Sequence, residues 1–419
     1  MELQTNTKTP SVMHVDLNSC FAIVEQQANP FLRGVPVGVA AYTGASGCVI
    51  SPSYEAKREG VKVGMRVSDA KQICPEIRII PPDPPKYRAV HQMFCRIFKD
   101  YTPVVVPKSI DEAVLDFDGM NYSLERLIKI GREIKLRMKL EIGEWITCNV
   151  GISTNRFLAK TAASLHKPDG LDVITHENVR DVLGKLDLID LCGINVRYKF
   201  RLNAHGIYTP LQFLDSSSNK LKKEVFKSIV GYYWYMRLRG WEIDQTEFGR
   251  KSYGQSYALH HYTNNKDELC RLLMKLCEKM GRRLRKAAFF AKGIHIGVLY
   301  SNGQLWHVGR KTEHPLYSTL ELYNEAKKYL ITASHLPVTH IFVSCFNLHD
   351  FRVQQLDLLD SGKDKRWRVS RSLDVVNNRY GEYVVLPSAT MKSMEEEIID
   401  RVPFGGIKEL EELYAVQQI

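Results

Sequence analysis

The stretch Val12-Met13-His14-Val15-Asp16-Leu17-Asn18-Ser19-Cys20-Phe21 decides how the first half of the chain folds. Its first six residues form an apolar run of strand length that contains one acid, Asp16. Residues 20–27 then have helical spacing, and Asn29-Pro30 ends that helix. A second acidic site, Asp111-Glu112, lies between two apolar runs that read as paired strands, at 104–106 and 113–115. We therefore expect strands that present carboxylates at their ends.

Three acids at the ends of adjacent strands, Asp16, Asp111 and Glu112, would repel one another. A buried carboxylate costs several kcal/mol unless it is paired or bound to a metal. Mg²⁺ takes one or two carboxylates and leaves its other positions to water and substrate phosphates. Two such ions about 3.5–4 Å apart can hold the attacking and leaving oxygens of a phosphoryl transfer. On spacing alone, solvated acids in a turn remain the alternative.

Outside these two stretches, strands and helices alternate over about the first 170 residues, which predicts an α/β or α+β domain with an insertion at 29–83. The proline-rich run at 81–85 is expected to be a connector. From 177 to 243 we expect short, cation-rich helices. Other expected helices cover 53–59, 67–73, 87–101, 124–140, 267–286, 317–331 and 370–380, and other strands cover 36–41, 146–152, 253–259, 293–300 and 339–346.

The composition of the 419 residues is that of a globular, basic protein. Lys and Arg number 58 against 47 Asp and Glu, a net charge of +11. No apolar run reaches the roughly 18 residues that a membrane span needs, so no membrane association is expected. Nine cysteines at spacings that fit neither a zinc site nor a disulfide framework indicate reduced thiols and a cytoplasmic protein. A basic charge fits nucleic acid but is weak evidence alone.

Four ordered motifs resemble those of the Y-family translesion DNA polymerases, nearest to their bacterial polymerase IV (DinB) and UmuC branch. They are Val15 to Phe21, Ser53 to Lys57, Ser109 to Ala113 and Gly151 to Lys160, and Lys167-Pro168-Asp169-Gly170 matches the close of the family's palm domain. The resemblance runs from about residue 13 to 389. It implies an α+β multidomain, right-hand polymerase fold. The expected parts are a palm at 1–28 and 84–174, small fingers at 29–83, a helical thumb at 175–243, an α/β little finger at 252–348 and a tail at 349–419.

The resemblance implies a template-directed, low-fidelity DNA polymerase that adds dNTPs to a primer 3′ end and copies past damaged bases in an SOS-type damage response. Asp16, Asp111 and Glu112, with the backbone carbonyl of Leu17, would bind two Mg²⁺ ions for two-metal phosphoryl transfer. Asn18 stands where many relatives have Asp, and we expect this change to be minor.

Further residues match the family's dNTP site. Phe21 is at the position of the steric gate that excludes ribose, although a Phe at this spacing, taken alone, fits core packing. Tyr54, Lys57 and Lys167 match residues that hold the triphosphate, with Lys160 as a weaker candidate. Many relatives carry Arg at the position of Lys57, and Lys offers a point charge instead of a bidentate fork.

The basic second half is expected to grip DNA. Gly193, Asn195 and Gly206 resemble a helix-hairpin-helix, whose turn binds phosphate through backbone N–H groups. Asn195 replaces a usual Gly, and Asn tolerates a positive φ. A plain helical hairpin is the alternative. Arg282, Arg283 and Arg285 resemble a little-finger stretch, although such cations also form ordinary solvated faces.

The expected partners are primer-template DNA, dNTPs and a sliding clamp, with the chain itself monomeric. Gln355, Leu356, Leu358 and Leu359 resemble a clamp-binding peptide, in which Leu359 replaces the usual Phe and offers a smaller apolar anchor. Two other functions are possible: a DNA- and clamp-binding protein without chemistry, and a nucleotide cyclase. The three intact acids argue against the first. The absence of a Gly-Gly-(Asp/Glu)-Glu-Phe turn argues against the second.

Overall fold

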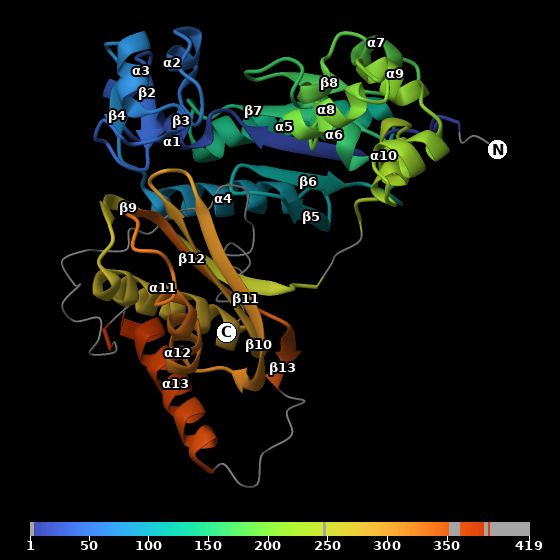
Figure 1. Cartoon of the computed structure of the whole chain (residues 1–419). Coiled ribbons are helices and arrows are strands. Elements are labelled where there is room, and N and C mark those ends of the chain that lie inside the picture. The colour runs from blue at the N-terminus through green and yellow to red at the C-terminus, as the bar shows by residue number, and fades with distance from the viewer. Residues whose placement is uncertain (1–3, 246–248, 352–360, 381–383, 386–419) are drawn as a thin grey trace. The chain divides into compact units, whose positions relative to one another are not determined.

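The computed structural model describes residues 4–245, 249–351, 361–380 and 384–385 (Figure 1). Side chains are not described at 260 and 361–364. The chain divides into two compact units, one within residues 1–247 and the other within 248–399. Together they form the α+β multidomain architecture that the sequence predicts. No helix among the described residues is long and apolar enough to cross a membrane.

A five-stranded sheet forms the centre of the first unit, and its middle strand is the apolar run of residues 12–17. Strand β1 (Val12–Leu17) pairs antiparallel with β6 (Glu112–Asp116) on one side and β7 (Cys148–Ser153) on the other. The order is β5-β6-β1-β7-β8, completed by β5 (Val104–Pro107) and β8 (Leu171–Val173). The predicted pairing of the two strands around Asp111-Glu112 is confirmed.

Side-chain alternation gives the two faces of this sheet different roles. The odd-numbered residues of β1, Met13, Val15 and Leu17, enter the main core. There they pack with residues from helices α1 (Cys20–Ala28), α4 (Pro84–Lys99) and α5 (Leu124–Arg137). The even-numbered residues, among them His14 and Asp16, point to the other face, where α6 (Arg156–Ala162) contacts β1 and β7. The chemistry-bearing side chains therefore lie opposite the hydrophobic core.

The helix predicted at 87–101 starts earlier than expected. It begins at Pro84 because Asp83 accepts a hydrogen bond from the Lys86 N–H, and proline is tolerated in the first turn, where N–H groups have no helical partner. The interpretation of 81–85 as a connector is therefore wrong for its last two residues. The helix predicted at 124–140 ends its α-helical part at Arg137 and continues as a π-helical turn at Met138–Ile142.

Residues 37–80 form a separate three-stranded sheet with the order β3-β2-β4. Its strands are β2 (Val37–Ala40), β3 (Val49–Pro52) and β4 (Arg78–Ile80), with the short helices α2 (Tyr54–Arg58) and α3 (Val67–Ile73). The sequence predicted β2 and both helices. It missed β3 and β4, which are only four and three residues long.

Short helices follow β8, as predicted. They are α7 (Val179–Leu183), α8 (Val196–Asn203), α9 (Pro210–Asp215) and α10 (Val230–Leu238), with a π-helical segment at Lys220–Val225. Their apolar residues and those of α6 share one core, which includes Phe213 and Trp234.

The second unit is a sheet of order β11-β10-β12-β9 backed by two helices. The strands are β9 (Ser252–Thr263), β10 (Phe289–Tyr300), β11 (Leu305–Leu316), β12 (Val338–Phe346) and the short β13 (Leu348–Asp350), which pairs with β10. The two backing helices are α11 (Lys266–Lys286) and α12 (Thr319–Leu330), and a third helix, α13 (Ser361–Tyr380), follows them in the sequence. The sequence missed β11, whose residues are mostly exposed and polar.

Candidate active site

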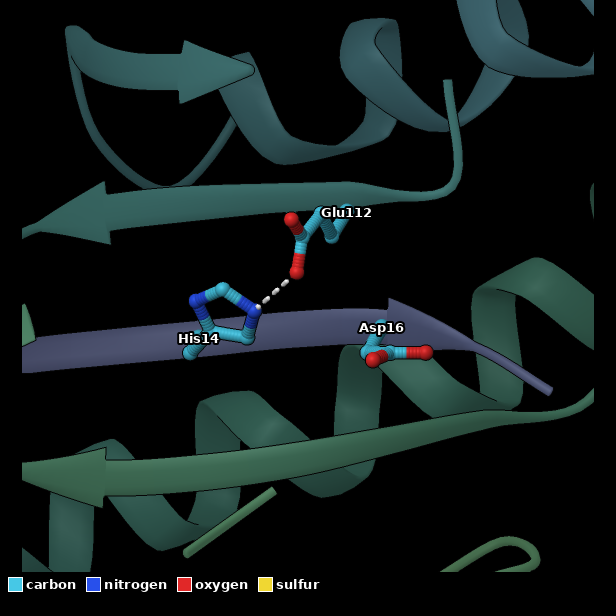
Figure 2. Close-up of side chains that lie close together, drawn as sticks. All are labelled: His14, Asp16 and Glu112. Atoms are coloured by element: carbon cyan, nitrogen blue, oxygen red, sulfur yellow. Dashed lines mark hydrogen bonds and ion pairs between the residues drawn. The ribbon is translucent and has the colours of Figure 1, made fainter. Parts of the chain in front are cut away.

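The pairing register brings two of the predicted acids together. Asp16 of β1 lies directly opposite Glu112 of β6, so their side chains leave the same face of the sheet. His14, two residues before Asp16, joins them on that face. Ligand atoms of these three residues all lie within 4.8 Å of one another, and Figure 2 shows the His14 ring facing the Glu112 carboxylate across the two strands.

Basic groups neutralise these carboxylates. The Lys167 ammonium lies 2.9 Å from Asp16 Oδ2. Glu112 Oε2 contacts two groups, Lys160 Nζ at 2.6 Å and His14 Nε2 at 3.0 Å. Lys160, predicted as a weaker phosphate ligand, therefore pairs with a proposed metal ligand. A cluster that already holds opposite charges at this distance is suited to binding a cation and an anionic substrate in their place.

Asp111 has a different environment. Its carboxylate accepts a hydrogen bond from the Ser109 hydroxyl, and it is not among the three residues within 4.8 Å. Burial raises the pKa of Asp111, and the charges of Asp16 and Glu112 raise it further, against the lowering effect of Ser109. For Glu112, burial also acts to raise the pKa, but His14 and Lys160 outweigh it and lower the pKa to about 2. Asp111 is therefore the acid of this site that most needs an added positive charge.

The donor set fits Mg²⁺. Carboxylate oxygens are its preferred protein ligands, and the mutual repulsion felt by Asp111 is what a bound cation removes. The Leu17 N–H donates to the Asp111 carbonyl over 2.8 Å. Because the N–H and C=O of one strand residue face the same neighbour, the Leu17 carbonyl also faces the segment that carries Asp111. This orientation is compatible with a ligand role for that carbonyl.

Residues of α2 reach the same site from the three-stranded sheet. The Lys57 ammonium donates to Ser19 Oγ over 2.7 Å and lies 4.5 Å from the centre of the Tyr54 ring. Burial lowers the pKa of Lys57, and the charge of Lys167 lowers it further, whereas Asp16 raises it. Burial raises the pKa of Tyr54 to about 12, and Asp16 adds to this shift. Tyr54, Lys57, Lys167 and Asp16 thus share one electrostatic environment.

Phe21, the predicted steric gate, is the second residue of α1. Its ring stacks on Tyr87 of α4 with a centroid distance of 4.4 Å, and 8% of the residue is exposed. The Tyr87 hydroxyl donates to Glu25 over 2.9 Å, which fixes the ring beneath Phe21. Phe21 therefore has a rigid support, and it lies five residues after Asp16.

The predicted helix-hairpin-helix residues lie around α8. Gly193 has a φ of +95°, which favours glycine, and Gly206 has a φ of +75° just after the helix. Asn195 has a φ of −97°, so the expected use of a positive φ is wrong. Its side chain instead accepts from the Tyr198 N–H and caps the helix. A cavity of about 350 Å³ extends from Glu112 to Gly193, and its cationic lining residues are Lys108, Arg156, Lys160 and Arg237.

The three arginines of α11 differ in their surroundings. Arg282 is half-buried and donates to Asn378 over 2.8 Å, and Arg283 donates to the Gly254 carbonyl over 3.3 Å. Arg285 is buried and makes a bidentate pair with Asp374 of α13. This interior placement does not support the predicted DNA contact at Arg285. The predicted clamp peptide at 355–359 lies outside the described residues.

His14 is the residue at this site that the sequence reasoning missed. Its ring is buried at 1% exposure, and its Nδ1 has no hydrogen-bond partner among the described residues. The signal was available: a histidine two residues before Asp16 in a strand must lie on the same face as that acid.

Comparisons with known proteins show the family of this chain. Residues 15–164 match the impB/mucB/samB family model, and residues 250–358 match the model of that family's C-terminal domain. DNA polymerase IV of Moorella thermoacetica is 32% identical, covering 90% of this chain and 94% of its own length. DNA polymerase IV 1 of Bacillus subtilis is 28% identical, covering 93% and 95%.

The solved structures that resemble this chain are also Y-family DNA polymerases. A Y-family DNA polymerase chimera of Dbh and Dpo4 has a TM-score of 0.71 and 28% identity, and it covers 81% of this chain and 99% of its own. An insertion ternary complex of Dbh DNA polymerase, with the same identity and coverage, has a TM-score of 0.54. The chain therefore belongs to the Y-family of translesion DNA polymerases, the impB/mucB/samB family, and is a DNA-directed DNA polymerase.

Proposed function

We propose that this chain extends a primer 3′ end with dNTPs at Asp16, Asp111 and Glu112, which hold two Mg²⁺ ions together with the Leu17 carbonyl. The observation that carries the proposal is the register that sets Asp16 opposite Glu112, with Asp111 one residue before Glu112. When bound, the ions supply Lewis-acid stabilisation to the attacking hydroxyl and the phosphate oxygens.

The chain's own residues would then orient the substrates. Lys167 and Lys57 carry positive charge beside Asp16, where a triphosphate would meet it. Tyr54 offers a hydroxyl in the same environment. Phe21, held against Tyr87, would exclude a ribose 2′-hydroxyl by collision. Lys160 and His14 fix the direction of the Glu112 carboxylate.

We assign the domains as the sequence suggests: palm at 1–28 and 84–174, fingers at 29–83, thumb at 175–243, little finger at 252–348 and tail at 349–419. We propose that the primer-template lies against the cationic cavity that joins Glu112 to Gly193. Asn195 and Gly206, which flank α8, and Arg282 and Arg283 of the little finger are the further proposed DNA contacts. We further propose binding to a sliding clamp through Gln355, Leu356, Leu358 and Leu359, a monomeric state, and a place in an SOS-type response in the cytoplasm.

The alternatives account for fewer observations. A binding protein without chemistry would not need three acids whose charges act on one another at the ends of two neighbouring strands. A cyclase would leave the cationic cavity and the second unit without a role.

The test is extension of a labelled primer on a short template with Mg²⁺ and all four dNTPs, beside Asp111→Ala and Glu112→Ala. We expect the added base to follow the template, and both variants to lose extension while they bind the duplex within a few fold. Full activity in either variant would contradict the assignment. No extension by the unaltered chain, with the duplex still bound, would favour the binding protein.

A further inference from the structure

A chain of buried amides lies beneath the residue proposed to hold the triphosphate. Asn18 is 1% exposed and Asn149, on the adjacent strand β7, is 0% exposed. The Asn18 Nδ2 donates to Asn149 Oδ1 over 2.7 Å. The Asp169 N–H donates to Asn18 Oδ1, and Asn149 Nδ2 donates to the His166 carbonyl, both over 2.9 Å. The two amides therefore hydrogen-bond to the loop backbone both before and after Lys167, at residues 166 and 169.

The direction of this hydrogen-bond chain is fixed at both ends. The Asp169 N–H can only donate, and the His166 carbonyl can only accept, so each amide has one possible orientation. A carboxylate at either position would set two acceptors against each other. With an acid at position 18, turning the Asn149 amide would only set its oxygen against the His166 carbonyl. With an acid at position 149, the carboxylate itself would face that carbonyl. Buried acceptors left without a donor are costly, so this hydrogen-bond network requires an amide at both position 18 and position 149.

The surroundings of the loop support a positioning role. Gly170 packs so closely that a Cβ there would lie 2.1 Å from the His166 carbonyl oxygen and 3.0 Å from Asn149 Nδ2. On its other side, the Lys139 ammonium lies 2.8 Å from Asp169 Oδ2, and Lys135 contacts the Asp169 carboxylate at 3.2 Å. The loop is therefore held from both sides, and the Lys167 ammonium extends from it to Asp16.

We propose that Asn18 and Asn149 are positioning residues, which together place the Lys167 ammonium beside Asp16 for the incoming dNTP. The inference rests on the proposed role of Lys167 in binding dNTP. It gives Asn18 a function beyond replacing an acid: the position needs both a donor and an acceptor because its partner is Asn149. Asn149 itself offers the cleaner test, because Asn18 also makes a side-chain hydrogen bond to Tyr54, another residue of the proposed dNTP site.

The experiment is single-turnover incorporation by the full chain with Asn149→Leu, Lys167→Ala and both changes together. Asn178→Leu is the control outside the site, because Asn178, which is only partly buried, also accepts from the Thr175 backbone N–H and donates to the Val173 carbonyl. We expect Asn149→Leu to raise the Kd for dNTP about tenfold, because the change leaves both Asn18 Nδ2 and the His166 carbonyl without their buried partner. Primer-template affinity should change less than about twofold, and Asn178→Leu should leave the dNTP Kd unchanged.

The double variant decides between the explanations. If Asn149 acts through Lys167, Asn149→Leu adds nothing in the Lys167→Ala background. If Asn149→Leu raises the dNTP Kd by the same factor in both backgrounds, or does not raise it at all, the positioning role of Asn149 is refuted. Either result leaves the proposed role of Lys167 intact. An unchanged dNTP Kd in Lys167→Ala would instead refute the proposed role of Lys167, and with it the positioning role of Asn18 and Asn149.

Discussion

Replacing Asp374 by Ala tests the account of how α13 is attached to the second unit. The Asp374 carboxylate makes two bonds to Arg285, of 2.6 and 2.7 Å, and the Arg285 side chain is only 2% exposed. Removing one partner of a buried pair leaves an uncompensated charge and costs about 3–5 kcal/mol. Arg285 keeps the Tyr317 carbonyl and the Thr319 hydroxyl as acceptors, so we expect the lower limit, about 3 kcal/mol.

Because Arg285 is on α11 and Asp374 is on α13, the loss of their bonds lowers the free energy that holds α13 against α11. A loss of about 3 kcal/mol raises the ratio of undocked to docked helix roughly a hundredfold. Amide hydrogen exchange of residues 365–380 in the full chain measures it, and we expect exchange there to accelerate by up to that factor. Val375→Ala is the control, because Val375 is 65% exposed on the same helix and should cause no acceleration.

A second variant separates the charge from the packing. Arg285→Met in the Asp374→Ala background removes the unpaired charge, so it should restore much of the protection. Unchanged exchange in Asp374→Ala would show that the other contacts of α13, such as those of Trp367 and Arg371, hold the helix without the buried pair, and the reasoning from that pair would be refuted.

Three further predictions concern substrate, pH and salt. Phe21→Val should admit ribonucleotides, measured as incorporation of one ribonucleotide against its deoxy form, and an unchanged preference would mean that another residue is the gate. Because Asp111 has a raised pKa and must be ionised to bind metal, extension should fall as the pH drops through that pKa, whereas Glu112, with a pKa of about 2, stays ionised. Ser109→Ala removes the bond that lowers the Asp111 pKa, so the acid limb of the rate, followed from about pH 5 to 8, should move to higher pH, and a shift to lower pH would contradict this. Arg282→Ala should reduce the salt slope of DNA binding by about 0.9, whereas the buried Arg285 changed to Met should leave the slope unaltered; equal slopes in Arg282→Ala and the unaltered chain would exclude a phosphate contact at Arg282.

The sequence predicted what depends on local periodicity. Strand β1 and its acid could be read from an apolar run, and the pairing across Asp111-Glu112 followed from two short strands joined by a turn. Strand β11 could not be read, because its exposed, polar residues carry little apolar alternation. The start of α4 was missed because two prolines were taken as a break, when a capping Asp83 makes them tolerable.

Partners distant in sequence explain what the site prediction lacked. Arg285 looked like one of three equivalent cations, and only the fold reveals Asp374 against it. Asn195 was expected to replace glycine through its backbone, yet it acts through its side chain as a helix cap. The bond between Asn18 and Asn149 could not be predicted, because the two residues lie 131 positions apart on different strands.

The proposed two-metal site is tested by the number of metal ions bound in the ternary complex. Mn²⁺, which can replace Mg²⁺ at oxygen ligands, would be titrated into the full chain with a dideoxy-terminated primer-template and a matching dNTP, and its binding followed by electron paramagnetic resonance. We expect two ions per chain, and fewer in Asp111→Asn at equal dNTP and DNA occupancy. A single ion in the unaltered chain, or two in Asp111→Asn with unchanged affinity, would contradict it.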